Sequence, residues 1–290
     1  MAKILITGAA GNVGLEVIRA FGDYTPDLSQ LRAGVWDMES EIGKIRAAGG
    51  AEVECVRFDF TDPATYSAFD GVRAVFLLRP PQLSNIARDI EPALDAAKAA
   101  GVEHVVFVSL VGVEERPYVP HYKVEAAVKA RGFDWTFLRC SFFMQNLNTT
   151  HREEIKTQGE IALPVGRAKT SFIDVRDIGA VAARVLTEPG HRNTAYTLTG
   201  SEALDYDEAA AILTGVLGRP IRYTNPHPVS FFARQLNDGK PVSYAVVVTL
   251  LYTMTRAGGA DVISADAERL LERPPITFRQ YVEDYRAAWV

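Results

Sequence analysis

The first fourteen residues constrain this chain more than any other part, because they place three glycines directly after a short apolar strand. Residues 4–14 read as a buried strand, a turn and the start of a helix, with Gly8, Gly11 and Gly14 at three-residue intervals. Gly8 permits a tight strand-to-helix turn, Gly11 lets a pyrophosphate approach the backbone, and Gly14 lets the helix lie close to the sheet. The helix N-terminus then faces the phosphates. This order of elements favours a dinucleotide-binding loop over a plain turn.

The first half of the chain alternates short β-branched runs with stretches of helical period, which is typical of a parallel sheet with crossover helices. One such helix is expected over 83–97, where an apolar stripe recurs at three- and four-residue spacing. We expect six strands, at 3–7, 31–36, 53–58, 74–78, 105–109 and 135–139. The sequence therefore predicts a doubly wound α/β sheet, whose ligand crevice lies beyond the carboxyl ends of the strands.

The regular alternation stops near residue 150. We expect a dinucleotide-binding Rossmann domain over 1–150, to which 170–188 also belongs. A smaller, mostly helical lobe over 151–290 is expected to pack on it and cover the crevice. In this second half, short strands are expected at 160–164, 170–174, 194–199 and 221–223, and helices at 175–186, 206–217, 229–236, 242–256 and 278–289.

Charge and composition exclude several classes of protein. The 290 residues carry 31 basic and 36 acidic side chains, and the formal charge of −5 offers nucleic acid or an anionic membrane no general attraction. Cys55 and Cys140 are too few for a disulfide framework, and the first residues do not read as an export signal. The longest apolar stretch, 244–252, is too short to cross a membrane. We therefore expect a cytoplasmic protein with a small-molecule substrate, and either a monomer or a homodimer.

Several segments beyond the glycine loop carry a resemblance to a known family. They are 7–14 (Thr-Gly-Ala-Ala-Gly-Asn-Val-Gly), 58–60 (Phe-Asp-Phe), 76–81 (Phe-Leu-Leu-Arg-Pro-Pro), 138–147 and 172–178. In these segments the chain resembles the NmrA-like group of atypical short-chain dehydrogenases/reductases, which includes quinone and triphenylmethane reductases. The resemblance spans most of the chain and implies a Rossmann fold and an NAD(P) cofactor.

The resemblance also implies which residues touch the coenzyme. They are Ala10, Gly11, Asn12 and Val13 at the pyrophosphate, Asp59 and Phe60 beside the adenine, and Leu78, Arg79 and Pro80 at the ribose on the nicotinamide side. Asp59 can equally belong to a solvated turn with Thr61 and Asp62, and the two roles are compatible.

The end of the second strand normally decides between NAD and NADP. An acidic side chain there binds the adenosine 2′-hydroxyl, whereas an arginine accommodates a 2′-phosphate. NADPH-using members of the group that this chain resembles usually carry arginine where this chain has Trp36. The carboxylate of Asp37 would repel a phosphate. The sequence therefore favours NAD. Three alternatives stay open: Arg32 or Lys44 supplies a cation, Asp37 merely caps the next helix, or the adenosine site no longer binds coenzyme tightly.

The tyrosine–lysine pair of common short-chain reductases is missing from the expected helix. Tyr118 and Lys123 are five residues apart, which is about 500° around a helix, and Pro120 interrupts the segment. His121 stands where the resembling enzymes often have a histidine or a lysine at the crevice. An imidazole titrates near neutrality and can donate a proton as hydride arrives. His121 can equally cap the helix or bond a neighbouring carbonyl.

Two further polar residues are candidate catalytic groups. By the same resemblance, Ser109 is a polar group near the nicotinamide, although it can also be a strand-end turn residue. Lys123 contacts a ribose hydroxyl or faces solvent, and Glu125 is expected to be structural. No His, Cys or acidic set has the spacing of a metal site, and Ser109 lacks the context of a hydrolytic nucleophile.

Aromatic side chains are the candidates for the substrate pocket. Phe142 and Phe143 follow the sixth strand, and Phe231 comes from the later lobe. Aromatics at such spacing are also common in protein cores, so both roles stay open.

Two functions of different classes fit these residues. The leading hypothesis is an NAD(P)-dependent reductase that transfers hydride to a small, apolar, conjugated acceptor such as a quinone. The alternative is a non-catalytic NAD(P)-binding redox sensor that acts through a protein partner. The missing tyrosine–lysine pair and the replaced arginine favour the sensor, whereas His121 and the aromatic residues favour the enzyme.

Overall fold

The computed structural model describes residues 3–25 and 27–290, which form two compact units. Unit 1 comprises the chain up to Cys140 together with Val175–Thr197, and unit 2 comprises Ser141–Asp174 and Leu198–Val290. The chain leaves unit 1 where strand β6 (Asp134–Cys140) ends, and it returns where helix α7 (Val175–Thr187) begins. The continuous part of unit 1 is thus ten residues shorter than the expected 1–150.

Unit 1 is built on a seven-stranded sheet in the order β3-β2-β1-β4-β5-β6-β8. Its other strands are β1 (Lys3–Thr7), β2 (Leu31–Val35), β3 (Glu54–Arg57), β4 (Val72–Leu77), β5 (His104–Leu110) and β8 (Thr194–Leu198). β1 pairs in parallel with both β2 and β4, so the order of strands reverses at β1. The doubly wound α/β fold and its six expected strands are confirmed.

The seventh strand corrects one expectation. Residues 194–199 were expected to form a short strand of the second lobe, but β8 lies beside β6 at the edge of the main sheet. The backbone N–H of Asn193 donates to Trp135 O, and Asn193 Oδ1 accepts from Trp135 N at 3.3 Å, so this contact holds the start of β8 against β6. A five-residue strand carries no signal of the sheet it will join, because its partner is far away in sequence.

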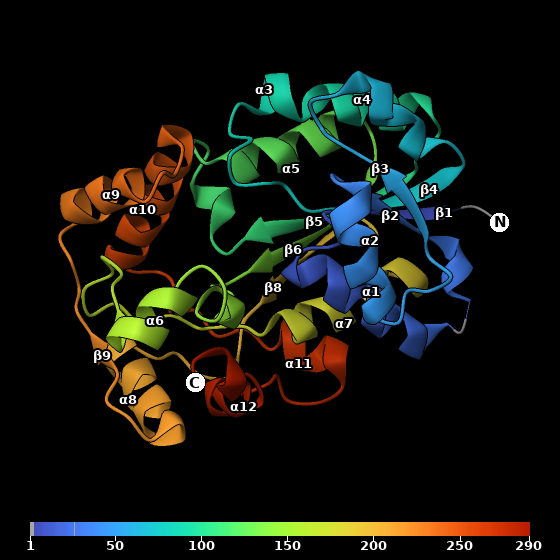
Figure 1. Ribbon diagram of the computed structural model, residues 1–290. Helices are drawn as coiled ribbons and strands as arrows, with labels where there is room; N and C mark the ends of the chain where they lie inside the picture. Colours follow the sequence, from blue (N-terminus) through green and yellow to red (C-terminus); the bar gives the residue numbers. More distant parts are fainter. Residues whose placement is uncertain (1–2, 26) are drawn as a thin grey trace. The chain divides into compact units, whose positions relative to one another are not determined.

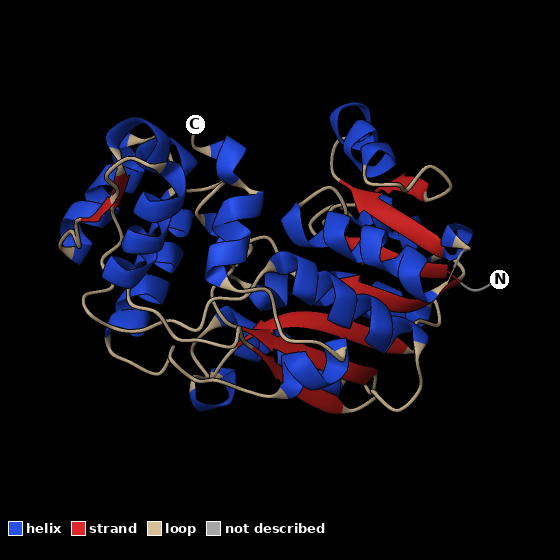
Figure 2. Cartoon of the chain, turned by 90° about the horizontal axis from the view of Figure 1, so that it is seen from below, coloured by secondary structure: helices blue, strands red, loops and turns tan. Residues whose placement is uncertain are grey.

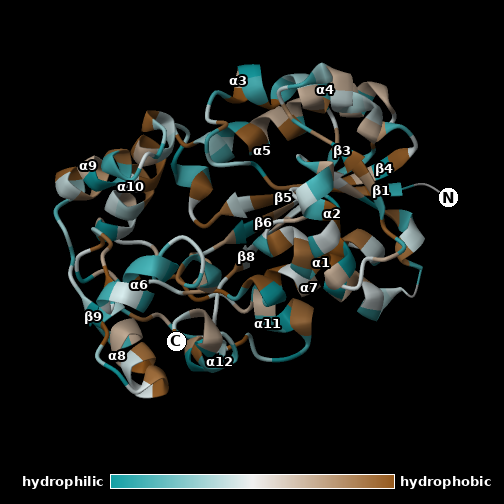
Figure 3. Ribbon diagram, in the orientation of Figure 1, coloured by the Kyte–Doolittle hydropathy of each residue, from teal (hydrophilic) through white to brown (hydrophobic). Residues whose placement is uncertain are grey.

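Helices cover both faces of the sheet (Figures 1 and 2). α1 (Asn12–Tyr24) packs against α7 on one face, and α4 (Glu91–Ala99) packs near α5 (Pro120–Ala130) on the other. Hydrophobic and hydrophilic residues alternate around α1 and α7, as expected for helices with one buried side (Figure 3). The remaining short elements of unit 1 are α2 (Met38–Ala47), α3 (Ile86–Asp89) and the 3₁₀ turns Leu28–Gln30, Pro63–Phe69 and Val113–Glu115.

The helix expected over 83–97 is divided in two. α3 ends at Asp89 and α4 starts at Glu91, and Ile90 between them has a φ of −121°, outside the helical region. Pro92 lies in the first turn of α4, where its missing N–H costs nothing. A continuous helix would instead bring its ring against the carbonyl of Arg88, so the proline explains the break.

Unit 2 is mostly helical, with a two-stranded parallel sheet of β7 (Glu160–Ile161) and β9 (Arg222–Tyr223). Its helices are α6 (Arg152–Gln158), α8 (Tyr206–Leu217), α9 (Pro228–Asn237), α10 (Val242–Arg256), α11 (Asp266–Leu271) and α12 (Phe278–Asp284), with 3₁₀ turns at Met144–Asn146 and Arg286–Ala288. Residues 170–174, expected as a strand, make only isolated bridges, from Thr170 to Leu204 and from Ile173 to Phe143. Among residues 3–25 and 27–290, no helix is both long enough and apolar enough to cross a membrane.

The contact between α1 and α7 yields a test of the packing. A Cβ added at Gly179 of α7 would lie 2.6 Å from the carbonyl carbon of Glu16, whereas one added at Gly43 of α2 would meet nothing within 4 Å. We expect Gly179→Ala to lower the free energy of unfolding by about 1–3 kcal/mol through overpacking. The matched change Gly43→Ala should raise it by about 0.5–1 kcal/mol. Urea unfolding checks both, and equal effects of the two variants would contradict the tight crossing.

Candidate functional site

The glycine turn lies at the carboxyl end of β1, next to β4. Gly8 has φ +61°, a left-handed conformation that favours glycine, and a Cβ there would lie 3.3 Å from a side-chain methyl of Leu78. The Thr7 hydroxyl donates to Phe76 O at 3.1 Å and accepts from Leu78 N at 2.9 Å. The hydroxyl therefore ties the end of β1 to the end of β4, where the strand order reverses and a ligand crevice is expected.

The N-terminus of α1 presents bare backbone at this turn. Its N-cap, Gly11, is extended (φ −83°, ψ 172°) and supplies no side-chain hydrogen bond. Gly11 and Asn12 are exposed, Ala10 is half-buried, and Val13 is buried and anchors the first turn. Uncapped N–H groups at a helix start bind anions, so this backbone fits a pyrophosphate.

The end of β2 carries two carboxylates and a large exposed ring. The Trp36 side chain is exposed (70% for the residue), and its backbone N–H donates to Glu41 Oε2 at 2.9 Å. Asp37 caps α2 by accepting from Glu39 N at 3.0 Å and from Ser40 Oγ at 2.6 Å. The hydrogen bond from Ser40 lowers the pKa of Asp37. The capping role of Asp37 is therefore observed, and Glu41 is a residue that the sequence analysis missed, although the acidic first turn of α2 was its signal.

The two proposed compensating cations are placed differently. Arg32 lies at the start of β2, where it bonds Glu54 Oε2 and the carbonyls of Ala68 and Asp70. These bonds hold Arg32 near the amino end of β2, whereas Trp36 and Asp37 follow its carboxyl end at Val35. Lys44 is exposed in the last turn of α2.

Asp59 and Phe60 follow β3 directly beside the end of β2. Asp59 Oδ1 accepts from the backbone N and the hydroxyl of Thr61, both at 2.8 Å, so it forms the expected turn. Phe60 is buried in the core of unit 1, with its ring edge-on to Phe58 at 4.9 Å. The ring of Phe60 is therefore part of the core, and its carbonyl accepts a hydrogen bond from the Tyr66 hydroxyl at 2.7 Å.

Arg79 lies in the loop after β4 and is almost completely buried, with 7% of its surface exposed. Its Nη1 donates to three carbonyls of the same loop, those of Pro80 at 2.8 Å, Pro81 at 3.1 Å and Leu83 at 2.9 Å. Its Nε is buried and has no hydrogen-bond partner in the described part of the chain. Burial lowers the pKa of Arg79 to about 10, so the group still carries its charge at neutral pH.

His121 lies in the first turn of α5, after Pro120 at the helix start. Its ring stacks on Phe107 with the centroids 6.1 Å apart, and its Nδ1 is buried without a partner among the described residues. Burial, together with the charge of Arg79, lowers the pKa of His121 to about 3. The expectation that this imidazole titrates near neutrality is therefore wrong, since both causes disfavour the charged ring. At neutral pH the ring is therefore uncharged, and it can donate a hydrogen bond through its N–H but carries no acidic proton.

Ser109 is held by a buried network at the ends of β5 and β6. Its hydroxyl donates to Glu125 Oε1 at 2.6 Å, and Arg139 bonds both oxygens of Glu125, at 3.2 and 2.9 Å. Arg139 also pairs with Glu114 at 3.1 Å. The structural role expected for Glu125 is observed. Because its proton is directed to Glu125, the Ser109 hydroxyl faces any further partner as an acceptor.

The structure does not bring Lys123 together with Ser109 and His121. Lys123 is exposed on α5, two residues and therefore about 200° around the helix from His121. Tyr118, which precedes the helix, is also exposed.

The three candidate substrate residues lie in unit 2 and differ in burial. The half-buried ring of Phe142 packs against Phe172, Tyr206 and Tyr252, with centroids 5.6, 6.4 and 5.9 Å apart. Phe143 is also half-buried and pairs with Ile173 through the backbone. Phe231 is 1% exposed, edge-on to Tyr252 at 5.5 Å, which is the environment of a core residue.

Unit 2 also contains a network of interacting polar side chains that sequence reasoning missed. Tyr252 OH and His151 Nε2 are 2.8 Å apart, His151 Nδ1 is 3.2 Å from Glu154 Oε1, and Glu154 pairs with Arg234 at 3.3 Å. Burial raises the pKa of Tyr252 well above its ordinary value. These residues come from α6 and the residue before it, from α9 and from α10, so their proximity has no signal in local sequence.

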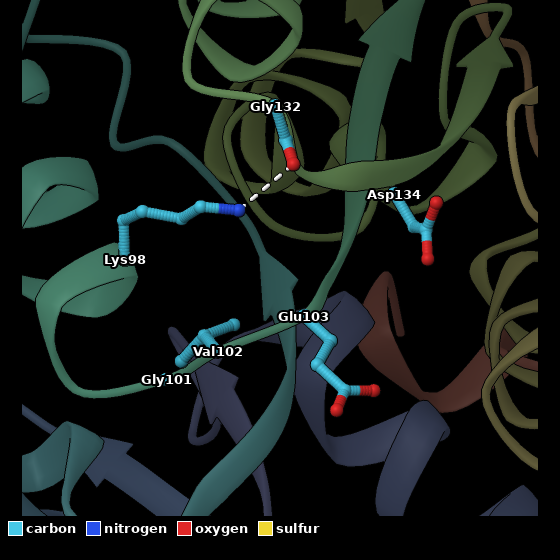
Figure 4. Close-up of a pocket in the computed structure, with 6 residues that line it drawn as sticks. All are labelled: Lys98, Gly101, Val102, Glu103, Gly132 and Asp134. Atoms are coloured by element: carbon cyan, nitrogen blue, oxygen red, sulfur yellow. Dashed lines mark hydrogen bonds between the residues drawn. The ribbon is translucent and has the colours of Figure 1, made fainter.

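A hollow of about 320 Å³ lies at the opposite edge of the sheet, where β5 and β6 begin (Figure 4). Lys98 Nζ donates to Gly132 O at 2.8 Å across it, and Glu103 and Asp134 line its other side. It is therefore separate from the glycine turn. In the described ranges, no group of three or more His, Cys, Asp or Glu side chains is arranged to hold a metal ion.

Comparisons with known proteins agree with this geometry. The model of the NmrA-like family matches residues 1–281. The NAD(P)H azoreductase of Xenophilus azovorans is 32% identical over 293 residues, which cover 99% of each chain. The structure of Citrobacter sp. triphenylmethane reductase complexed with NADP(H) is 25% identical, covers 98% of this chain and 100% of its own, and has a TM-score of 0.83. The NADPH-dependent quinone oxidoreductase of Escherichia coli complexed with NADPH is 27% identical, with coverages of 97% and 99% and a TM-score of 0.83.

The environment of His121 yields a pH prediction. His121 has a pKa of about 3 in the folded chain, whereas an unfolded chain has the ordinary value of about 6.5. Between these values the unfolded chain binds more protons, so this residue lowers the stability as the pH falls from about 6.5 towards 3. His104, whose pKa burial lowers to about 4, acts in the same direction.

Histidine NMR checks this prediction. We expect the ring signals of His104 and His121, assigned through single His→Gln variants, to stay constant from about pH 8 to about pH 5. A His121 signal that titrates between about pH 6 and 7 would contradict the described environment.

Proposed function

Because the chain belongs to the NmrA-like family, we propose that it is an NAD(P)-dependent reductase that transfers hydride to a small, apolar, conjugated acceptor of the quinone type. One observation carries the proposal most directly. The bare N-terminus of α1 meets the glycine turn where the strand order reverses, and this geometry fits a pyrophosphate.

The named relatives support an enzyme over a redox sensor. The azoreductase is matched over nearly its whole length, as are the triphenylmethane reductase and the quinone oxidoreductase. An azo group, a triphenylmethane dye and a quinone are all conjugated acceptors of hydride. A small-molecule substrate of this class follows for the present chain.

The roles of unit 1 side chains follow from their protonation. The bound coenzyme supplies the hydride. We assign His121 as a hydrogen-bond donor to the hydride acceptor through its neutral N–H, since its imidazolium does not form at neutral pH. The proton that accompanies the hydride then comes from water. The Ser109 hydroxyl oxygen can only accept a hydrogen bond from a ligand, because the hydroxyl donates its own hydrogen to Glu125. Lys123 has no assigned step, because its side chain is exposed on another side of α5.

The roles of unit 2 side chains follow from their burial. The half-buried Phe142 and Phe143 are the rings proposed to contact the acceptor. Phe231 is proposed to support this wall from behind through Tyr252, because it is itself inaccessible.

The coenzyme preference proposed for this chain is NAD. Asp37 and Glu41 place two carboxylates around the backbone of Trp36, and a 2′-phosphate there would meet like charge. The indole of Trp36 is free to stack on the adenine, whereas an arginine at this place would neutralise a phosphate. Arg32, bonded at the other edge of the sheet, does not compensate.

Coenzyme binding is the first test of the function. Titration of the protein with NADH and NADPH should quench tryptophan fluorescence and raise the melting temperature. Gly11→Val should still fold, although its Cβ would lie 3.2 Å from Gly8 O, and it should weaken binding more than about tenfold by blocking the approach of the pyrophosphate. Binding of neither coenzyme would remove the chain from the reductases, and unchanged affinity of the variant would overturn the loop assignment.

The β2 end gives a second test. Trp36→Arg should raise the affinity for NADPH relative to NADH by about tenfold, since it adds a bidentate partner for phosphate. Gln30→Arg adds the same charge before the start of β2 and should leave the ratio unchanged. The ratio of the two dissociation constants decides the point, and an unaltered ratio in Trp36→Arg would place the adenosine elsewhere.

A further inference from the structure

Arg79 carries a positive charge into the interior without a carboxylate to balance it. The residue is 7% exposed, and within residues 3–25 and 27–290 its hydrogen bonds go to the three neutral carbonyls of Pro80, Pro81 and Leu83. Buried charges are normally paired, because removal from water is costly. An uncompensated buried cation therefore needs an explanation other than stability.

The carboxylates of Glu114 and Glu125 do not provide this balance. Glu125 accepts from both Arg139 and Ser109, and Glu114 pairs with Arg139, so these carboxylates face another arginine. The group that does respond to Arg79 is His121, which its charge helps to keep neutral. The field of Arg79 is thus felt at the N-terminal turn of α5.

The position of this charge is fixed and lies on one side of the glycine turn. Arg79 is the second residue after β4. Leu78, which precedes it, donates its backbone N–H to the hydroxyl of Thr7 at the end of β1. In a doubly wound sheet the adenosine lies towards β2, so the other half of the coenzyme extends towards β4. The two hydrogens of Nη1 reach three carbonyl oxygens, one hydrogen being shared, and so hold the guanidinium in its loop.

We propose that Arg79 makes the coenzyme site select the reduced over the oxidised nicotinamide. This inference rests on the proposed function and adds the redox form that the site prefers. The nicotinamide ring is neutral when reduced and gains a positive charge when it has lost hydride. A fixed cation on that side therefore repels only the oxidised form. The selection assists release of oxidised coenzyme after turnover.

The effect expected from one fixed charge is moderate. Like charges a few side-chain lengths apart at the dielectric of a protein surface alter a binding ratio by about five- to tenfold. Salt screens exposed charges but acts much less on buried ones. The preference for the reduced coenzyme should therefore persist when salt is raised from about 50 mM to about 500 mM.

Calorimetric titration with NADH and NAD⁺, and with NADPH and NADP⁺, tests the proposal in the absence of any acceptor. The wild type should bind the reduced form about five- to tenfold more tightly. Arg79→Met should bring this ratio close to one, mainly by tightening the oxidised form, while Arg79→Lys keeps the charge and most of the ratio. Arg73→Met removes one positive charge from the exposed first half of β4 and should leave the ratio unchanged.

The outcomes separate this proposal from the one it rests on. If the wild type binds neither pair, the reductase assignment itself fails. If it binds both redox forms equally, only the selection by Arg79 fails. A purely structural role would appear as Arg79→Met weakening both forms by the same factor, with the ratio intact. If Arg79→Met does not fold, the proposal can still be refuted by the wild type alone. A wild-type ratio near one, or a ratio that disappears at high salt, would contradict it.

Discussion

The carbonyl oxygen of Gly8 occupies the space that a side chain at position 14 would need, since a Cβ there would lie 2.4 Å away. This one steric fact sets the distance between α1 and the sheet. On its other side, α1 meets α7 at Gly179, again backbone against backbone. With Thr7 tying β1 to β4, the N-terminus of α1 cannot move independently of the strands around it. The N-terminus of α1 is held in place because glycines at both contacts let backbone approach backbone.

Features that depend on neighbouring residues could be predicted from the sequence. The glycine turn and the six parallel strands have local patterns, and α8 and α10 fall where their periodicity places them. Two local expectations failed for physical reasons. Pro92 divides the helix expected over 83–97, and the strand at 194–199 joins a sheet whose edge is formed far away in sequence. Neither the partner of a short strand nor the choice between two helices and one is fixed by hydrophobic spacing.

The candidate site shows a sharper limit. That His121 lies near the crevice was inferred from resemblance, but its protonation depends on burial and on Arg79, which is 42 residues away in the chain (121 minus 79). The direction of the Ser109 proton likewise depends on Glu125, whose charge is held by Arg139 from another strand. Identity and position of a polar residue can be read from sequence. Its donor or acceptor character is a property of the folded surroundings.

The exposed indole of Trp36 has a consequence for how such a protein can diverge. Its side chain supports no part of the core, and the hydrogen bond at this position is made by its backbone, which any residue except proline provides. If Trp36 has the role proposed above, replacement of its side chain changes the coenzyme preference without a cost to folding, whereas Gly14 has no room for a side chain. Selection for a new coenzyme and selection for a stable fold act on different residues in this chain. A lineage with this architecture can change its cellular source of reducing power in few steps while its scaffold stays the same.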